Sequence, residues 1–167
     1  MSRLFLLRHA KAGWAEPGMR DFDRPLDAAG KEHAEATGIA MRDGGYTPEL
    51  VICSSARRAR ETLEGIAKNL ATGRVTYTEG LYSTDAAGYV DIIRDAPPVG
   101  SILMIGHNPM MEDVALALSG DGREEARHAM VAGFPTSGLA VIRFPGTFAE
   151  AAPGKGYLDA FLTTTDL

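Results

Sequence analysis

The chain has 167 residues, which is enough for one domain of ordinary size and leaves little room for a second. Hydrophobic residues make up 45% and charged residues 23%, which argues against a disordered chain, a collagen-like repeat and a coiled coil. The formal net charge of −5 disfavours general nucleic-acid binding. Cys53 is the only cysteine, so an internal disulfide framework and a zinc site of several cysteines are excluded.

No stretch approaches the roughly 18 consecutive apolar residues that a membrane-spanning helix needs. The apolar run near the N-terminus, Leu4–Leu7, is short and has charged residues on both sides, which is a poor pattern for a signal peptide. We therefore expect a single cytoplasmic domain over residues 1–167 that associates with neither membranes nor nucleic acid.

Short apolar runs predict the strands of a buried sheet. In chain order these runs are Leu4–Leu7, Leu50–Cys53, Val75–Tyr77 and Ile102–Ile105. Helices are expected over Gly30–Met41, Ala59–Leu70, Asp85–Ile93 and Asn108–Leu118. Suitable N-caps precede the last three of them, namely Ser54 or Ser55, Asp85, and Asn108 followed by Pro109.

The C-terminal part has a different pattern. Gly138–Phe144 and Tyr157–Leu162 predict an antiparallel hairpin at the edge of the sheet, and Ser119–Thr136 predicts a helix plus a loop over the site. The complete prediction is an α/β fold: a three-layer α/β/α sandwich with a mostly parallel sheet and an antiparallel edge.

Residues that bind anions follow three of the predicted strands. Arg8 and His9 follow the first strand, Arg57 and Arg58 the second, and His107 the fourth. The carboxyl ends of parallel strands meet at one edge of a sheet, so these side chains are expected to converge there. The helix after His107 is expected to point its N-terminus at the same place and to offer an anion site.

Arginines and imidazoles gathered around a helix N-terminus are typical of a phosphate-binding pocket. One histidine can attack phosphorus and the other can donate to the phosphoryl oxygens, but the spacing does not choose between His9 and His107 as the nucleophile. Arginines supply positive charge, so no metal ligand set is needed. Each motif also fits an ordinary role, such as a surface pair or a solvated basic face over Arg57–Arg60, and only their coincidence favours the pocket.

Other reactive residues are expected to have structural roles. Cys53 lies on an apolar run and is expected to be a buried thiol. His128 is expected on the surface, with a place at the mouth of the site as the alternative. Trp14 is either an aromatic wall for the substrate or an anchor for its loop.

The motifs resemble those of the histidine phosphatase superfamily, which includes the cofactor-dependent phosphoglycerate mutases. The matching elements are Arg8-His9 after the first strand, Ser54 to Thr62 with Arg58 as the pocket arginine, and Gly106-His107. The branch that the chain resembles most is that of the compact SixA-type phosphohistidine phosphatases. The further features shared with it are Asp21–Leu26, Gly106–Pro109 and Phe134–Val141.

The resemblance implies a phosphoglycerate-mutase-like fold and a covalent mechanism without metal or cofactor. His9 is expected to attack phosphorus and to become transiently phosphorylated. Arg8, Arg58 and His107, with Asn108 beside them, are expected to hold the phosphoryl oxygens until water releases inorganic phosphate.

One departure from the family pattern bears on the substrate. Many relatives carry a glutamate that protonates an alcohol leaving group, whereas the matching position here holds Ser83, and Glu79 and Asp85 are out of register. Without this acid, cleavage of a phosphomonoester is handicapped, while a phosphoramidate can carry a proton on its own nitrogen. The sequence therefore favours phosphohistidine in a phosphorylated protein over a small phosphorylated metabolite.

Three alternatives remain open at this point. A general small-molecule phosphatase could use Glu79 or Asp85 as its acid. A non-catalytic module could have kept the phosphate pocket. A metal-dependent hydrolase with His9 and His107 as ligands is the weakest alternative, because no carboxylate stands beside them at matching spacing.

Overall fold

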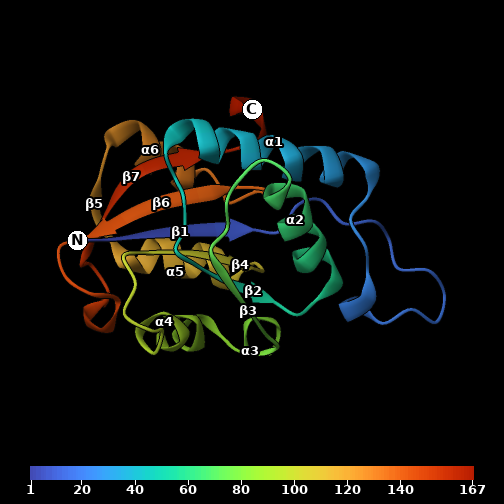
Figure 1. The fold of residues 1–167 in the computed structure, drawn as a ribbon, viewed down its shortest axis with the longest axis horizontal. Coiled ribbons are helices and arrows are strands. Elements are labelled where there is room, and N and C mark those ends of the chain that lie inside the picture. Colours follow the sequence, from blue (N-terminus) through green and yellow to red (C-terminus); the bar gives the residue numbers. More distant parts are fainter.

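The computed structural model describes residues 1–167, and a seven-stranded sheet in the order β3-β2-β4-β1-β6-β7-β5 runs through its middle (Figure 1). The strands are β1 Ser2–Arg8, β2 Leu50–Ser54, β3 Arg74–Thr78, β4 Ser101–Gly106, β5 Ser119–Gly122, β6 Leu139–Phe144 and β7 Gly156–Leu162. The four predicted apolar runs therefore form β1 to β4, each a residue or more longer than its apolar centre.

Six of the strands run in one direction, and β6 alone runs against its neighbours β1 and β7. The predicted α/β class and mostly parallel sheet are confirmed, as is the antiparallel pairing of β6 with β7. The expected position of this hairpin at the sheet edge is wrong, because β5 pairs in parallel with the outer side of β7. The β5 sequence, Ser-Gly-Asp-Gly, has no apolar residue that could have predicted a strand.

Helices cover both faces of the sheet (Figure 1). The helices are α1 Ala28–Gly44, α2 Arg57–Ala67, α3 Gly80–Ser83, α4 Ala86–Arg94, α5 Met110–Leu118 and α6 Glu124–Val131. Side chains alternate along a strand, so in β1 Phe5 and Leu7 pack with α1 and α2, while Leu4 and Leu6 pack with α4 and α5. The three predicted layers are present, and no helix is both long and apolar enough to span a bilayer.

Close backbone contact between α1 and α2 fixes the helix that carries Arg58. A Cβ atom on Gly38 of α1 would lie 2.5 Å from the carbonyl oxygen of Ile66 in α2, so only glycine fits there. On α2, the Thr62 hydroxyl donates to the carbonyl of Arg58 at 2.7 Å and accepts the N–H of Ala10 at 2.9 Å. These contacts tie α2 to the segment that follows His9.

Two of the predicted helix caps differ from the structure. Asp85 accepts the N–H of Gly88 at 2.9 Å and caps α4 as predicted. The prediction for α2 is wrong, because Ala56 is its N-cap and neither Ser54 nor Ser55 makes a cap bond. Helix α5 begins at Met110, one residue beyond Pro109.

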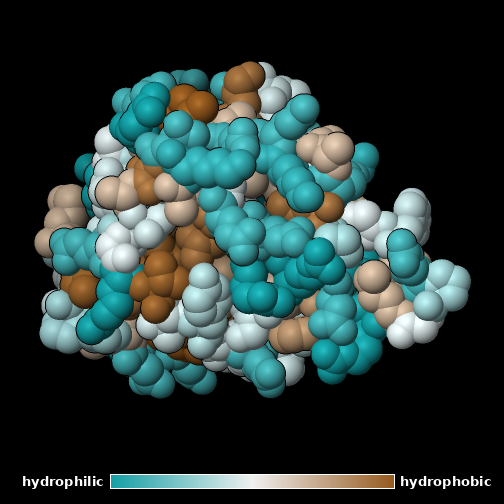
Figure 2. All heavy atoms as spheres, turned by 45° about the vertical axis from the view of Figure 1, so that its right-hand side comes forward, coloured by the Kyte–Doolittle hydropathy of each residue, from teal (hydrophilic) through white to brown (hydrophobic).

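The segment between β1 and α1 projects beyond the carboxyl ends of the parallel strands (Figures 1 and 2). It contains one 3₁₀ turn, Asp21–Asp23, and an isolated bridge between Ala12 and Leu26. Trp14, on this segment, is 93% exposed and therefore neither anchors the loop nor lines an enclosed wall. Residues 119–136 form β5, α6 and a connecting loop. The predicted helix is present and packs on β7, and the predicted loop reaches the carboxyl ends of the parallel strands, where Thr136 lies beside Arg8 and His9.

Candidate active site

The carboxyl ends of β1, β2 and β4 bring the predicted site residues together. Arg8 is paired with Gly106 in the register of β1 and β4, and the N–H of His9 donates to the carbonyl of Gly106 at 3.0 Å. The rings of His9 and His107 consequently lie 5.2 Å apart, centroid to centroid. Around them is a pocket of about 300 Å³, lined by Arg8, His9, Lys11, Ala12, Arg24, Arg58, His107, Asn108 and Thr136.

The hydrogen bonds of His9 define which ring nitrogen carries the proton. Nδ1 lies 2.7 Å from the carbonyl oxygen of Ala10, which can only accept, so Nδ1 is the donor. Nε2 accepts the Nε–H of Arg58 at 3.3 Å. Burial is the main cause that lowers the pKa of His9 to about 3, with further lowering by His107, Arg58 and Arg8 against the opposing Ala10 bond. His9 is therefore a neutral imidazole whose Nε2 lone pair lies beside a guanidinium.

His107 is held by two hydroxyl groups. Its Nε2 lies 2.8 Å from the Ser54 hydroxyl, and its backbone N–H donates to the Tyr89 hydroxyl at 3.1 Å. Its Nδ1 is buried and has no protein partner. Burial and the charge of Arg58 lower the pKa of His107 to about 4. Ser54 is thus a support for His107 instead of a helix cap.

Arg58 differs from the other arginines of α2. It is 7% exposed, and its NH1 and NH2 groups donate to the backbone and carboxylate oxygens of Asp21 at 2.8 and 3.0 Å. Arg57 pairs with Glu61 at 2.9 Å, and Arg60 donates to the carbonyl of Ser55 at 2.9 Å. The solvated basic face therefore exists at the neighbouring arginines, while Arg58 lines the pocket.

Arg8 and Asn108 share one acceptor at the wall of the pocket. Arg8 NH1 and Asn108 Nδ2 both donate to the carbonyl oxygen of Phe134, at 3.0 and 2.9 Å. Arg8 Nε is buried without a protein partner, and burial lowers the pKa of this guanidinium. Asn108 Oδ1 accepts the N–H of Glu112 at 3.1 Å, and because Nδ2 gives one of its two hydrogens to Phe134, one amide hydrogen remains.

Helix α5 begins beside the pocket, but most N–H groups at its start are occupied by hydrogen bonds within the chain. The N–H groups of Met111, Glu112 and Asp113 already donate to acceptors in residues 107–109. Only Met110 keeps an N–H in the first turn that has no acceptor. The positive character of the pocket therefore comes from its arginines.

Two residues at the rim were not identified from the sequence as site residues. Asp21 Oδ2 accepts from Arg58 and from the Tyr82 hydroxyl at 2.9 Å, and Oδ1 accepts from Arg24 at 2.9 Å. These hydrogen bonds lower the pKa of Asp21 to about 2, and the bond from Arg24 has the largest effect. The Tyr82 ring meets His107 edge-on at 5.5 Å. Asp21 stands in the stretch that resembles SixA-type proteins, and this resemblance is the only signal for it in the sequence.

The remaining reactive residues lie apart from the pocket. Asp85 caps α4, and Glu79 lines a neighbouring groove. His128 is on α6 with a side chain 80% exposed and lines a separate hollow. Cys53 is fully buried, and burial raises its pKa to about 12, as expected of a structural thiol.

No group of three or more histidine, cysteine, aspartate or glutamate side chains could hold a metal ion.

Comparisons with known proteins agree with this architecture. The family model of the histidine phosphatase superfamily (branch 1) matches residues 4–89. An uncharacterized protein of Mycobacterium tuberculosis is 35% identical over 159 residues, which is 93% of this chain and 98% of the relative.

Solved structures extend the likeness to the whole chain. SixA of Agrobacterium tumefaciens, provisionally named a phosphohistidine phosphatase, is 36% identical with a TM-score of 0.83, over 97% of this chain and 98% of its own. The similarly named protein from Nakamurella is 28% identical, also with a TM-score of 0.83, over 97% of this chain and 95% of its own. The chain therefore belongs to the histidine phosphatase superfamily, and within it the SixA phosphatases are its structural neighbours.

Proposed function

We propose that the chain removes the phosphoryl group from phosphohistidine in proteins through a covalent intermediate on His9. The arrangement of four atoms at one pocket supports this proposal. Nε2 of His9 has its lone pair beside the Nε–H of Arg58, and Arg8 Nε and His107 Nδ1 are buried without protein partners. A phosphoryl group in the pocket supplies oxygens to these nitrogens and phosphorus to His9.

The proposed reaction has two steps. The Nε2 lone pair of His9 forms a bond to phosphorus, and the bond between phosphorus and the substrate nitrogen breaks with its electron pair going to that nitrogen. Arg8, Arg58, His107 and the free amide hydrogen of Asn108 stabilise the charge on the phosphoryl oxygens. Water then attacks phosphorus, which restores neutral His9 and releases inorganic phosphate.

The choice of phosphohistidine depends on proton supply. The carboxyl group nearest to Arg58 is that of Asp21, and its pKa of about 2 keeps it ionised at neutral pH, so it has no proton for an alkoxide. Ser83, at the position expected for the family acid, donates its hydroxyl to the carbonyl of Glu79. A phosphoramidate can carry a proton on its own nitrogen, so its leaving group depends less on such an acid. The names of the SixA structures point to the same class of substrate.

A small-molecule phosphomonoester is the second candidate, and the position of Glu79 favours it. Glu79 is exposed and lines the groove next to the pocket, where it could protonate an alcohol. A panel of phosphomonoesters separates the two candidates. Vigorous turnover that collapses in Glu79→Ala would support the second one.

The test of the first candidate is an assay with a phosphohistidine-containing protein in the presence of a chelator. We expect release of inorganic phosphate, an acid-labile phosphoryl group trapped on His9, and a loss of at least about a thousandfold in His9→Ala. His128→Ala, a change at an exposed histidine on α6, should keep full activity. Absence of turnover in the wild type, or unchanged turnover in His9→Ala, would rule the proposal out. A phosphoryl group trapped on His9 during turnover would exclude a non-catalytic binding module.

A further inference from the structure

A second hollow of about 400 Å³, here called the lateral groove, adjoins the phosphate pocket. It is lined by Arg20, Asp21, Phe22, Glu79, Tyr82 and Ser83. His107 connects the two spaces, because its ring lies 5.2 Å from that of His9 and 5.5 Å from that of Tyr82. A substrate whose phosphoryl group is in the pocket therefore has the lateral groove within reach of the group that carries it.

Aromatic rings form one wall of the lateral groove. Phe22 and Tyr82 meet edge-to-face with centroids 5.0 Å apart and an interplanar angle of 86°. The Arg58 guanidinium carbon is 5.8 Å from the Tyr82 ring centroid, so this wall continues to the pocket. Rings in this arrangement present flat apolar surface to another planar group.

The polar groups of the lateral groove are mainly hydrogen-bond acceptors. The Tyr82 hydroxyl gives its proton to Asp21, so its oxygen can act towards a ligand only as an acceptor. Glu79 is exposed and has no ion pair or side-chain hydrogen bond. The Ser83 hydroxyl donates to the backbone, and Arg20 is bound to Asp23 through Nε and NH2. A group that brings N–H donors fits this set better than an alcohol that needs a proton.

We infer that the lateral groove binds the leaving group, and that it selects a planar nitrogen ring, the imidazole of phosphohistidine, over an alcohol. The inference rests on the proposed function and assigns its substrate specificity to residues outside the phosphate pocket. Phe22 and Tyr82 contact the ring, and the Glu79 carboxylate accepts the N–H of the ring nitrogen that does not carry phosphorus.

The proton balance of the first step agrees with this placement. The ring enters as an imidazolium cation, with a proton on the remote nitrogen and phosphorus on the other. When His9 Nε2 bonds to phosphorus, the electron pair of the broken bond stays on the leaving nitrogen, and the ring departs as neutral imidazole. The remote proton is retained throughout and needs only an acceptor, which is what Glu79 supplies.

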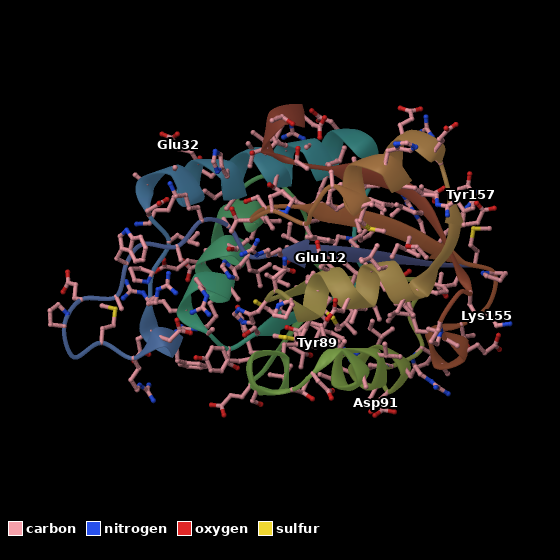
Figure 3. All side chains as sticks on the ribbon, turned by 180° about the vertical axis from the view of Figure 1, so that it is seen from behind. Glu32, Tyr89, Asp91, Glu112, Lys155 and Tyr157 are labelled. Atoms are coloured by element: carbon pink, nitrogen blue, oxygen red, sulfur yellow. The ribbon has the colours of Figure 1, made fainter.

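Two variants test the inference without disturbing Arg58. Glu79→Gln removes the charged acceptor, and Phe22→Leu removes the aromatic wall. Each is assayed with a phosphohistidine peptide and with acetyl phosphate, whose small leaving group has no ring and no N–H. We expect kcat/KM for the peptide to fall about tenfold, mainly through KM, while acetyl phosphate turnover changes less than about twofold. Glu32→Gln, on the outer side of α1 (Figure 3), is the matched control and should change neither.

Three results would overturn the inference. Equal losses of kcat/KM with both substrates, in variants as stable as the wild type, would mean that the substitutions disturb the phosphate pocket and not the binding of the leaving group. Unchanged peptide kinetics would mean that the leaving group lies elsewhere. Loss of phosphomonoester turnover in Glu79→Gln would make Glu79 a proton donor. Failure of the proposed function can be told apart from failure of this inference, because it is seen in the wild-type protein. That protein would then hydrolyse acetyl phosphate but not the phosphohistidine peptide.

Discussion

The Nε–H of Arg58 donates to Nε2 of His9 across 3.3 Å, although the two residues are 49 positions apart in the chain. This contact aligns the lone pair of the neutral imidazole with the positive group that neutralises phosphoryl oxygens. Asp21 holds the other end of the same guanidinium through its backbone and side-chain oxygens. The nucleophile and its electrostatic support are therefore fixed relative to one another.

Replacement of Arg58 by lysine should lower kcat/KM by about 10- to 100-fold. A lysine has a single ammonium group and cannot bond Asp21, His9 and a phosphoryl oxygen in the planar arrangement of a guanidinium. Arg57→Lys and Arg60→Lys, made in the same helix, should retain activity within about twofold because those side chains bond elsewhere. Steady-state kinetics of the three variants checks this, and equal losses in all three would contradict it.

The Ser54 hydroxyl should contribute to turnover through His107. Ser54→Ala removes the partner of His107 Nε2, so the imidazole is free to rotate and kcat should fall about tenfold. The neighbouring Ser55 makes no side-chain hydrogen bond, so Ser55→Ala should behave as the wild type. A kcat for Ser54→Ala equal to that of Ser55→Ala would show that His107 keeps its orientation without the hydroxyl.

Tyr89 should matter for stability. Its hydroxyl accepts the N–H of His107 and donates to the carbonyl of Leu81, and the residue is fully buried. Burial raises its pKa to about 12, so the hydroxyl stays protonated. In Figure 3 Tyr89 lies on the side of α4 that faces α5. Tyr89→Phe leaves two buried polar groups without a partner and should lower the free energy of unfolding by about 1–3 kcal/mol.

Urea unfolding measures this loss, and Tyr157→Phe is the control. Tyr157 lies at the opposite end of the sheet from the pocket and its hydroxyl makes no hydrogen bond, so its removal should change stability by less than about 0.5 kcal/mol (Figure 3). A Tyr89→Phe protein as stable as Tyr157→Phe would contradict the prediction.

The protein should lose stability as the pH falls below 6.5. In the unfolded chain His9 and His107 take up protons near pH 6.5, whereas in the folded protein their pKa values are about 3 and about 4. Between these values the unfolded state binds more protons than the folded state. The free energy of unfolding therefore decreases as the pH is lowered, by up to about 1.4 kcal/mol per pH unit for each histidine.

Unfolding experiments at pH values from about 7.5 to 5 check this dependence. His107→Asn should flatten the slope, because one of the two titrating side chains is removed. The exposed His128 offers the comparison, since His128→Gln should retain the wild-type slope. A free energy of unfolding that stays constant over this range would refute the burial of two neutral histidines.

Much of the fold could be predicted because it depends on local patterns. Strands buried on both faces need unbroken apolar runs, and those runs stand out in β1, β2 and β4. The strand β5 escaped prediction because its four polar and glycine residues gain their pairing from β7, which is a tertiary effect. The four-residue helix α3 is also too short to have a recognisable period.

The site could be predicted only where it follows strand ends. Arg8, His9 and His107 are placed by the register of two adjacent parallel strands, which the sequence pattern indicates. Asp21 reaches Arg58 from a projecting loop, and Tyr82 reaches Asp21 from 61 positions away. No spacing rule connects such loops, so these contacts needed the three-dimensional structure.

The reversed direction of β6 gives the protein a way to change its substrates. Its first residue, Leu139, is paired with Leu7 near the end of β1, so the connection before β6 reaches the same rim from the opposite side, where Thr136 contributes to the wall. An insertion in this connection would reshape that wall without shifting the register of the strands that carry His9 and His107. Evolution could therefore alter the range of accepted partners by loop length alone, while the reaction chemistry stays constant.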